Sequence, residues 1–153
     1  MKSSRLVPCL LALAGFCMSL PAAAQFAKSE DAVKYRKAAF QVMAAHFGRL
    51  GAMASDKAPY DAAAAAMNAD LVVTMSKLPY AGFVEGTAGT EKGAPKANVW
   101  TEHARFDAAA KKMQDEVTKL AAAAKSGKAD QLKAAFGPAA GACKSCHDDF
   151  RNP

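Results

Sequence analysis

Three residues near the C-terminus have the side-chain types and the spacing needed to attach a cofactor. Cys143 and Cys146 are separated by two residues, and His147 follows at once. On a helix, residues three or four apart share a face, so both thiols and the imidazole would lie on one side. The two thiols can form thioethers with the two vinyl groups of one porphyrin, and the imidazole can bind its iron. The segment Cys143-Lys144-Ser145-Cys146-His147 therefore predicts covalent attachment of one haem c.

Two other uses of these cysteines are weaker alternatives. A disulfide between Cys143 and Cys146, of the thioredoxin-like kind, needs a βαβ context that the sequence lacks. A zinc site needs two more ligands, which His46 and His103 could supply only by accident. Export to an oxidising compartment also suits the assembly of c-type cytochromes, so haem attachment is favoured.

Residues 1–24 predict a secretory signal peptide. Two basic residues precede an apolar stretch that is too short to span a bilayer, and alanines at 22–24 form a small-residue cleavage end. A lipoprotein signal at Cys17 is the alternative, but the bulky Phe16 stands where such signals need a small residue. We therefore expect a periplasmic mature protein that begins at Gln25.

The remaining residues, 25–153, predict one domain. They carry 18 Lys and Arg, which is 20 less Lys2 and Arg5, and 14 Asp and Glu, a surplus of four positive charges. This surplus is too small to indicate nucleic-acid binding. No later segment has eighteen unbroken apolar residues, so no membrane span is expected. A chain of this size buries a core without disulfides.

The sequence predicts an all-α fold, because no stretch shows the alternation of strands and four segments have apolar residues at intervals of three and four. Ser29 is the expected N-cap of the first helix, which ends at Gly51, and Pro59 and Asp61 open the second, which Pro79 stops. Four such helices form an antiparallel bundle, with a long crossover loop between the second and the third. The predicted helices span about residues 29–51, 59–78, 99–125 and 130–150.

Each predicted helix has one inward face. In the fourth helix, Pro138 removes a hydrogen bond and should bend the axis. The aromatic residues Tyr80, Phe83 and Trp100, in or near the Gly-rich crossover loop, indicate that it folds over something apolar, so Phe83 is a candidate cofactor contact. The predicted inward residues are Val33, Arg36, Phe40, Met43, Phe47 and Leu50; Ala64, Met67, Leu71, Thr74 and Leu78; Val99, His103, Phe106, Ala110, Met113, Val117, Leu120 and Ala124; and Leu132, Phe136, Ala139, Cys143, Cys146 and Phe150.

The position of the motif restricts the second axial ligand of the iron. Only six residues follow His147, so such a ligand comes from another helix or is absent. Met43 is the best candidate from the residue pattern, although a Met on a helical seam usually packs in the core.

Several segments resemble cytochrome c′, the class II c-type cytochromes of bacterial periplasms. Near the C-terminus, Cys-Lys-Ser-Cys-His is followed by Asp-Asp-Phe-Arg, and the first helix reads Glu-Asp-Ala-Val-Lys-Tyr-Arg-Lys-Ala-Ala-Phe-Gln-Val-Met-Ala-Ala-His-Phe-Gly. The likeness continues through residues 58–62, 78–80, 100 and 132–137. It covers essentially all of residues 25–153. Pro138 and a somewhat longer loop at 83–95 depart from the family pattern.

The resemblance implies a homodimer that associates through the first two helices, with one five-coordinate, high-spin haem per chain bound by His147. Nitric oxide and carbon monoxide then bind the open side of the iron. In the low-spin relatives, the cytochromes c-556, a Met of the first helix fills that side. Alignment through the Pro-Tyr-Asp segment puts Phe40 at that position, so Phe40 is expected to cover the open side.

Two arginines are further candidates for haem contact. Arg36 falls on an inward face, where a buried charge needs a partner, and a haem propionate would serve. The alternative is that Arg36 extends outward along the surface. Arg151 lies four residues after His147, and the resemblance places a basic residue there beside the proximal pocket.

These observations lead to three functional hypotheses. The first is a nitric oxide-binding haem protein that protects against or buffers the gas, and it is not an enzyme. The second is a low-spin electron carrier with Met43 as axial ligand and an unidentified periplasmic redox partner. The third is a peroxidase, which needs polar groups on the open side that Phe40 does not supply.

Overall fold

The computed structural model describes residues 25–153, so the predicted signal peptide lies outside the described residues. Within this range the chain is helical, with no strand and one isolated bridge between Pro95 and Arg151. No helix of residues 25–153 has the length and apolar character needed to cross a membrane. The elements are α1 (Ser29–Ala54), α2 (Ala62–Met75), the 3-10 helix η1 (Pro79–Gly82), α3 (Asn98–Thr101), α4 (His103–Lys125) and α5 (Ala129–Phe150).

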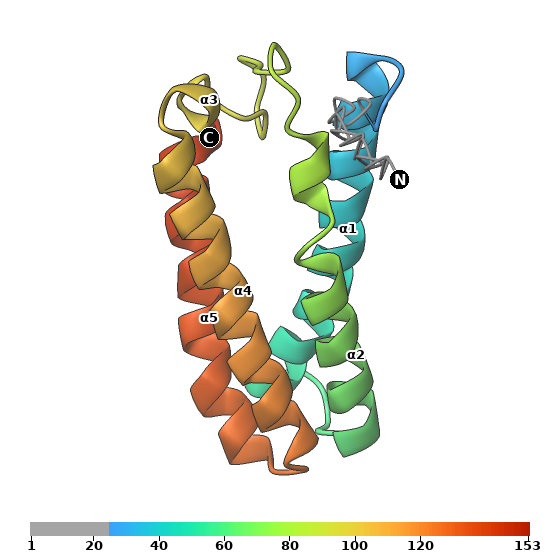
Figure 1. Cartoon of the computed structure of the whole chain (residues 1–153). Helices are drawn as coiled ribbons and strands as arrows, with labels where there is room; N and C mark the ends of the chain where they lie inside the picture. Colours follow the sequence, from blue (N-terminus) through green and yellow to red (C-terminus); the bar gives the residue numbers. More distant parts are fainter. Residues whose placement is uncertain (1–24) are drawn as a thin grey trace, which may run out of the picture.

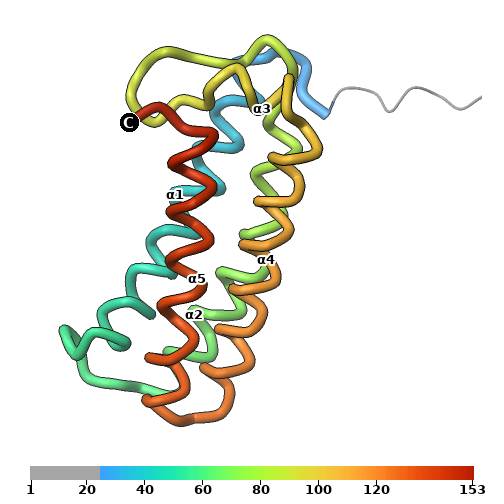
Figure 2. Tube along the Cα trace, turned by 90° about the vertical axis from the view of Figure 1, so that its left-hand side faces the viewer, coloured from blue at the N-terminus to red at the C-terminus, as the bar shows by residue number. Residues whose placement is uncertain are grey.

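The four long helices form an antiparallel bundle, as predicted. α1 descends in Figure 1, α2 returns, and a long segment crosses the end of the bundle before α4 descends and α5 returns. α1 packs against α2 and α5, and α4 packs against the same two helices. Figure 2 shows the crossover segment, which includes η1 and α3, at the end of the bundle where α5 finishes. The crossover and the C-terminus therefore lie together.

Apolar side chains fill the bundle in two clusters. The larger one lies in the half away from the crossover, and its fully buried members include Leu50, Val72, Leu120 and Leu132. The smaller one lies beneath the crossover and contains Val99, Phe106 and Phe150, with Tyr80, Phe83 and Trp100 packed against them. The expectation that these three aromatics cover something apolar is confirmed.

Helix α1 differs from the prediction at both ends. Lys28 occupies the N-cap position, without a side-chain hydrogen bond, and Ser29 is already helical. The helix continues past Gly51 to Ala54. Gly51 serves packing rather than termination, because a Cβ at this position would lie 2.7 Å from Cζ of Phe136. The Phe136 ring is itself stacked on Phe47 at 4.7 Å, so it has little room to move.

We expect Gly51→Ala to destabilise the protein, although alanine favours helices. Overpacking against the Phe136 ring should outweigh the gain in helix propensity, which is about 0.5–1 kcal/mol. Gly48 on the same helix is a matched control, because a Cβ there meets nothing within 4 Å. Gly48→Ala should raise the free energy of unfolding, and the two variants should differ by about 2 kcal/mol in urea titrations. Equal stabilities would contradict this packing role.

The predicted inward face of the second helix is wrong by one position. Asp61 opens α2 as predicted, since its side chain accepts a hydrogen bond from the Ala64 amide at 2.9 Å, but Pro59 lies before the helix, which begins only at Ala62. However, the buried residues of α2 are Ala65, Asn68, Ala69 and Val72. The predicted residues Met67, Leu71 and Leu78 are 56%, 37% and 39% exposed, and Thr74 is exposed as well. Small residues form the inward face and let α2 approach its neighbours closely.

The predicted faces of the last two helices are largely confirmed. On α4 the residues from Phe106 to Ala124 at the predicted spacing are buried. His103 is the exception, because the chain breaks at Glu102 between α3 and α4 and turns the imidazole outward to pair with Asp107 at 2.9 Å. On α5, Leu132, Ala139 and Phe150 are buried, and Pro138 is exposed within a helix that continues through it.

Candidate haem site

The Cys143–His147 segment lies in the last two turns of α5 and forms one wall of a cavity of about 500 Å³. Residues of α1, α2, α4, α5 and the crossover line the cavity. The apolar lining consists of Phe40, Met43, Ala44, Phe47, Val72, Tyr80, Phe83, Pro95, Phe106, Met113, Val117 and Phe150.

The two thiols are available for attachment. Both cysteines are free and half-buried, and both line the cavity. Burial raises the pKa of Cys143, and burial together with the nearby Cys143 and Asp149 raises the pKa of Cys146. Both side chains are therefore uncharged thiols at neutral pH. The disulfide alternative does not describe this structure.

The zinc alternative lacks its further ligands. The imidazole of His46 donates from Nδ1 to Oδ1 of Asn68 at 2.7 Å, between α1 and α2, and His103 pairs with Asp107 on the surface. Neither lines the cavity. Among residues 25–153 there is no cluster of three or more His, Cys, Asp or Glu side chains that could hold a metal ion.

The chemistry of the cavity lining fits a haem. Its wall is mostly aliphatic and aromatic, which suits the apolar faces of a porphyrin. The two thiols, of Cys143 and Cys146, lie three residues apart on one face of α5, and the imidazole of His147 follows directly. The haem would be held by Cys143, Cys146 and His147, and its iron supplies the site at which a small ligand can bind.

The environment of His147 favours the neutral imidazole. Partial desolvation lowers the pKa of His147, the positive charge of Arg151 lowers it further, and the carboxylate of Asp148 opposes part of this shift. The neutral ring is the form that binds metals. His147 and Arg151 also line a second hollow of about 590 Å³, bounded by Phe47 and by residues of α5 and the C-terminus.

Backbone hydrogen bonds tie the crossover to the C-terminal residues around this site. The Gly93 amide donates to Asn152 O at 3.0 Å, and the Asn152 amide donates to Ala94 O at 2.9 Å. The Lys96 amide donates to Phe150 O at 2.9 Å. These bonds position the end of α5, and with it His147, beneath the crossover.

Arg36 is buried, with 4% of its surface exposed, which excludes the outward-extended alternative. Its Nη1 donates to Gly82 O at 3.0 Å and to the Thr87 hydroxyl at 2.5 Å, and Nη2 donates to Thr87 O at 2.7 Å. The guanidinium also lies 5.0 Å from the centre of the Phe83 ring. Burial lowers the pKa of Arg36, and Glu91 partly opposes this shift. Arg36 thus anchors the crossover to α1, while its predicted contact with a propionate stays a prediction.

We expect Arg36→Met to lower the free energy of unfolding by about 2–4 kcal/mol, because it leaves two carbonyls of the crossover without donors. Urea titration of the haem-loaded protein measures the loss. Arg49→Met on the exposed part of the same helix is the control and should change stability by less than about 0.5 kcal/mol. A loss no larger than that of Arg49→Met would show that Arg36 does not anchor the loop.

Phe40 and Phe83 form part of a connected aromatic wall. The rings of Phe40 and Phe83 meet edge to face at 6.2 Å. Phe83 also contacts Phe106 at 4.9 Å, Tyr80 at 6.1 Å and Trp100 at 6.4 Å. The indole Nε1 of Trp100 donates to Phe83 O at 3.1 Å, which fixes the loop over the cavity.

All seven predicted site residues line the cavity: Cys143, Cys146, His147, Arg36, Phe40, Phe83 and Arg151. Sequence reasoning assigned Phe47, Phe106, Met113 and Val117 to the core, and it did not distinguish core from cavity wall. It also missed Lys92, which lines the cavity, and Gly82 and Thr87, which bind Arg36. The need for glycine at position 82 is visible only in the structure, because a Cβ there would lie 2.6 Å from Ala32 O.

Comparisons with known proteins agree with this site. A sequence model of the cytochrome c′ family matches residues 31–151. The cytochrome c′ of Alcaligenes xylosoxydans is 46% identical over 127 residues, which are 83% of this chain and 98% of that relative. The cytochrome c′ of Rubrivivax gelatinosus is 50% identical over 127 residues, with the same coverage.

Solved structures of these relatives share the fold. The crystal structure of the Rubrivivax gelatinosus protein matches with a TM-score of 0.78 and covers 84% of this chain and 100% of that one. A nitric oxide complex of a variant of the Alcaligenes xylosoxidans protein matches with a TM-score of 0.78 and 44% identity, over 84% of this chain and 99% of that one. Cytochromes c′ carry covalently attached haem c, for which this cavity offers both thiols and the imidazole. The chain therefore belongs to the cytochrome c′ family.

Proposed function

We propose that this protein is a periplasmic haem protein that binds nitric oxide and carbon monoxide at an iron ligated by His147 alone, and that it protects against nitric oxide or buffers it. The observation that carries the proposal is the ring of Phe40, which lines the cavity from α1 together with Met43, Ala44 and Phe47. A phenyl ring cannot bind iron, and it keeps water away while leaving room for small, weakly polar diatomics. The nitric oxide complex of the Alcaligenes xylosoxidans relative supports the same use of the cavity.

A low-spin electron carrier is the second candidate, because Met43 also lines the cavity. Met43 is half-buried and lies three residues after Phe40, on the same side of α1. A thioether from this position could complete the coordination of the iron and restrict the protein to electron transfer.

Peroxidase chemistry has less support. An arginine does line the cavity, but the Nη groups of Arg36 are engaged by Gly82 and Thr87. A group held in this way is poorly placed to assist cleavage of an O–O bond. The proposed role is therefore ligand binding rather than catalysis.

Optical and EPR spectra of the purified ferric and ferrous protein, with and without nitric oxide, test the proposal. We expect high-spin spectra in both oxidation states and ready formation of a ferrous nitrosyl. Low-spin spectra with a Met-to-iron charge-transfer band would overturn the proposal and identify Met43 as the second ligand.

We also propose a homodimer that associates through α1 and α2. Its support is a set of large apolar side chains that are exposed on and just after these helices, namely Val42, Met67, Leu71 and Leu78. Exposed apolar residues of this size gathered on neighbouring helices are typical of association surfaces.

We expect Leu71→Glu to weaken dimerisation at least about tenfold, since a buried carboxylate without a partner is costly. Sedimentation equilibrium measures the dissociation constant. Val84→Glu is the matched control, because Val84 is also 37% exposed but lies in the crossover. A monomeric wild-type protein, or equal effects of the two variants, would contradict an α1–α2 interface.

A further inference from the structure

The charge surplus of the chain gathers along the cavity and the adjoining hollow. Six cations line the cavity or the adjoining hollow: Arg36, Lys37, Lys92, Lys96, Lys144 and Arg151. Asp148 is the one acidic side chain that lines either space, and Glu91 lies just outside, with its carboxylate 3.9 Å from Lys37. The difference of four equals the whole surplus of residues 25–153.

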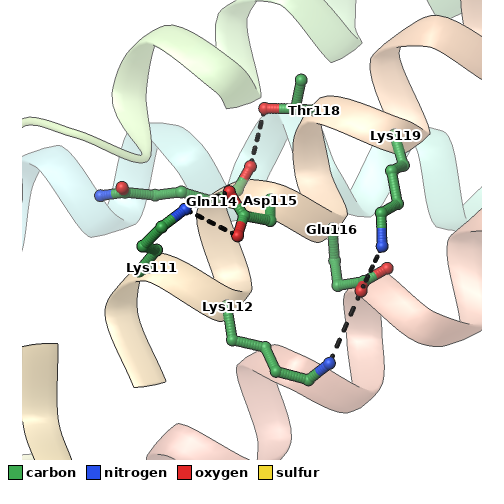
Figure 3. Close-up of polar contacts among 7 residues, drawn as sticks. All are labelled: Lys111, Lys112, Gln114, Asp115, Glu116, Thr118 and Lys119. Carbon is green, nitrogen blue, oxygen red and sulfur yellow. Dashed lines mark hydrogen bonds and ion pairs between the residues drawn. The ribbon is translucent and has the colours of Figure 1, made fainter. Parts of the chain in front are cut away.

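The rest of the described chain is electrically balanced. Twelve of its 18 basic residues and 12 of its 14 acidic residues remain, so they cancel. Many of them also pair locally. On α4, Lys111 pairs with Asp115 at 2.9 Å, and Glu116 lies between Lys112 at 3.6 Å and Lys119 at 2.9 Å (Figure 3). The positive end is thus a local feature and not a consequence of a generally basic surface.

Three of the cations at the opening are not cancelled by a carboxylate of residues 25–153. Lys92 and Arg151 are exposed, and neither forms an ion pair within the described chain. Lys96 donates from Nζ to the carbonyls of Asp148 at 2.8 Å and Asp149 at 3.3 Å, which hold the ammonium in place without neutralising it. The carboxylate of Asp149 is turned to Arg105, at 2.8 Å.

Five of these cations come from segments far apart in the sequence. They lie on α1, in the crossover, on α5 and in the C-terminal residues, and backbone hydrogen bonds hold the crossover to residue 152. We call Lys37, Lys92, Lys96, Lys144 and Arg151 the cationic rim. The two propionates of a haem would reduce the surplus of four but not cancel it.

We propose that the cationic rim is the docking surface for an acidic electron-transfer protein that reduces the haem. This inference rests on the proposed haem function, since carbon monoxide binding needs the ferrous state. The partner gives up one electron, ferric iron becomes ferrous, and no covalent bond forms or breaks. Charges of opposite sign around an opening steer an encounter and orient it, and the effect weakens with salt.

The test uses electron exchange between the holoprotein and two small complexes of opposite charge. The ferrous protein is mixed in stopped flow with ferricyanide, a trianion, or with tris(phenanthroline)cobalt(III), a trication. We expect the rate with ferricyanide to fall with ionic strength and the rate with the cobalt complex to rise. Lys92→Glu should slow the ferricyanide reaction about tenfold at about 10 mM ionic strength and less than about twofold at about 0.5 M.

Lys57→Glu is the matched control, because Lys57 is also exposed but lies in the α1–α2 turn, at the opposite end of the bundle (Figure 1). It changes the net charge by the same amount and should alter the rate by less than about twofold. Equal slowing by Lys92→Glu and Lys57→Glu would show that total charge matters, and would overturn a local docking surface.

Two further measurements separate the remaining alternatives. A poly-L-glutamate chain stands in for the acidic partner, and it should inhibit the ferricyanide reaction of the wild type but not of Lys92→Glu. Absence of inhibition would show a site for small anions only and would overturn the proposal. A second outcome would also overturn the proposal: the reduction potential of Lys92→Glu shifts, but the salt dependence of its reaction rate stays that of the wild type. Lys92 would then interact with the haem propionates and not with a partner. The salt dependence of the rate can be measured whether the iron is high-spin or low-spin. The docking proposal and the proposed function can therefore be contradicted independently.

Discussion

Replacing both Cys143 and Cys146 by alanine should abolish covalent haem attachment. The two thiols are the only cysteines of residues 25–153, and both line the cavity from one face of α5. With neither thioether possible, the haem can bind only through His147 and apolar contact, and it is lost on denaturation. Denaturing electrophoresis with haem staining measures the effect, and we expect complete loss of the stained band.

The control for this variant lies between the two cysteines. Ser145 is exposed and does not line the cavity, so Ser145→Ala should retain a full haem stain. The single variants Cys143→Ala and Cys146→Ala should each retain one thioether and a shifted pyridine haemochrome band. Covalent haem in the double variant would show that another residue attaches the cofactor, and it would remove the basis of the site.

The second large effect concerns ligand access. Phe40→Ala should raise the affinity of the ferrous protein for carbon monoxide on the order of tenfold to a hundredfold, because it removes the ring that we place over the open side. Titration of the ferrous protein with carbon monoxide, followed by its optical spectrum, measures the dissociation constant. Phe40→Met should instead give a low-spin spectrum, if a thioether from this position can reach the iron.

Phe47→Leu is the matched control for ligand access. Phe47 lies two turns further along α1 and also lines the cavity, but its ring is stacked on Phe136 at 4.7 Å. We expect the variant to lose stability by about 1 kcal/mol and to keep the wild-type affinity for carbon monoxide. An affinity gain as large as that of Phe40→Ala would mean that general loosening of the cavity, and not a ring over the iron, controls binding.

Patterns within single helices were sufficient for much of the fold. The three-four spacing of large apolar residues predicted the buried stripe of α4 from Phe106 to Ala124, because their burial contrasts with the charged residues between them. The same method failed on α2, where the inward residues are Ala65, Ala69 and Val72. Alanine carries little hydrophobic contrast, so Met67 and Leu71 marked the wrong face.

The partner of Arg36 shows a different limit. Its position on an inward stripe correctly predicted burial, since the stripe follows from local periodicity. Its hydrogen-bond partners, Gly82 and Thr87, lie 46 and 51 residues away in the crossover. A loop without periodicity does not indicate which of its residues approach a helix, so the contacts of Arg36 could not be predicted. A haem propionate was therefore the partner expected from the sequence.

The sequence by itself determined the haem-attachment motif of this protein and most of the inward faces of α4 and α5, which carry large apolar residues. The Cys143–His147 motif is local, because its spacing acts within one helical turn, and its family resemblance extends through the chain. Only the tertiary structure decided which inward residues form a packed core and which line a cavity, since that depends on how far apart four helices are held. It also decided that cations from four separate segments meet at one opening, because charges distant in sequence become neighbours only when the crossover and the C-terminus are joined.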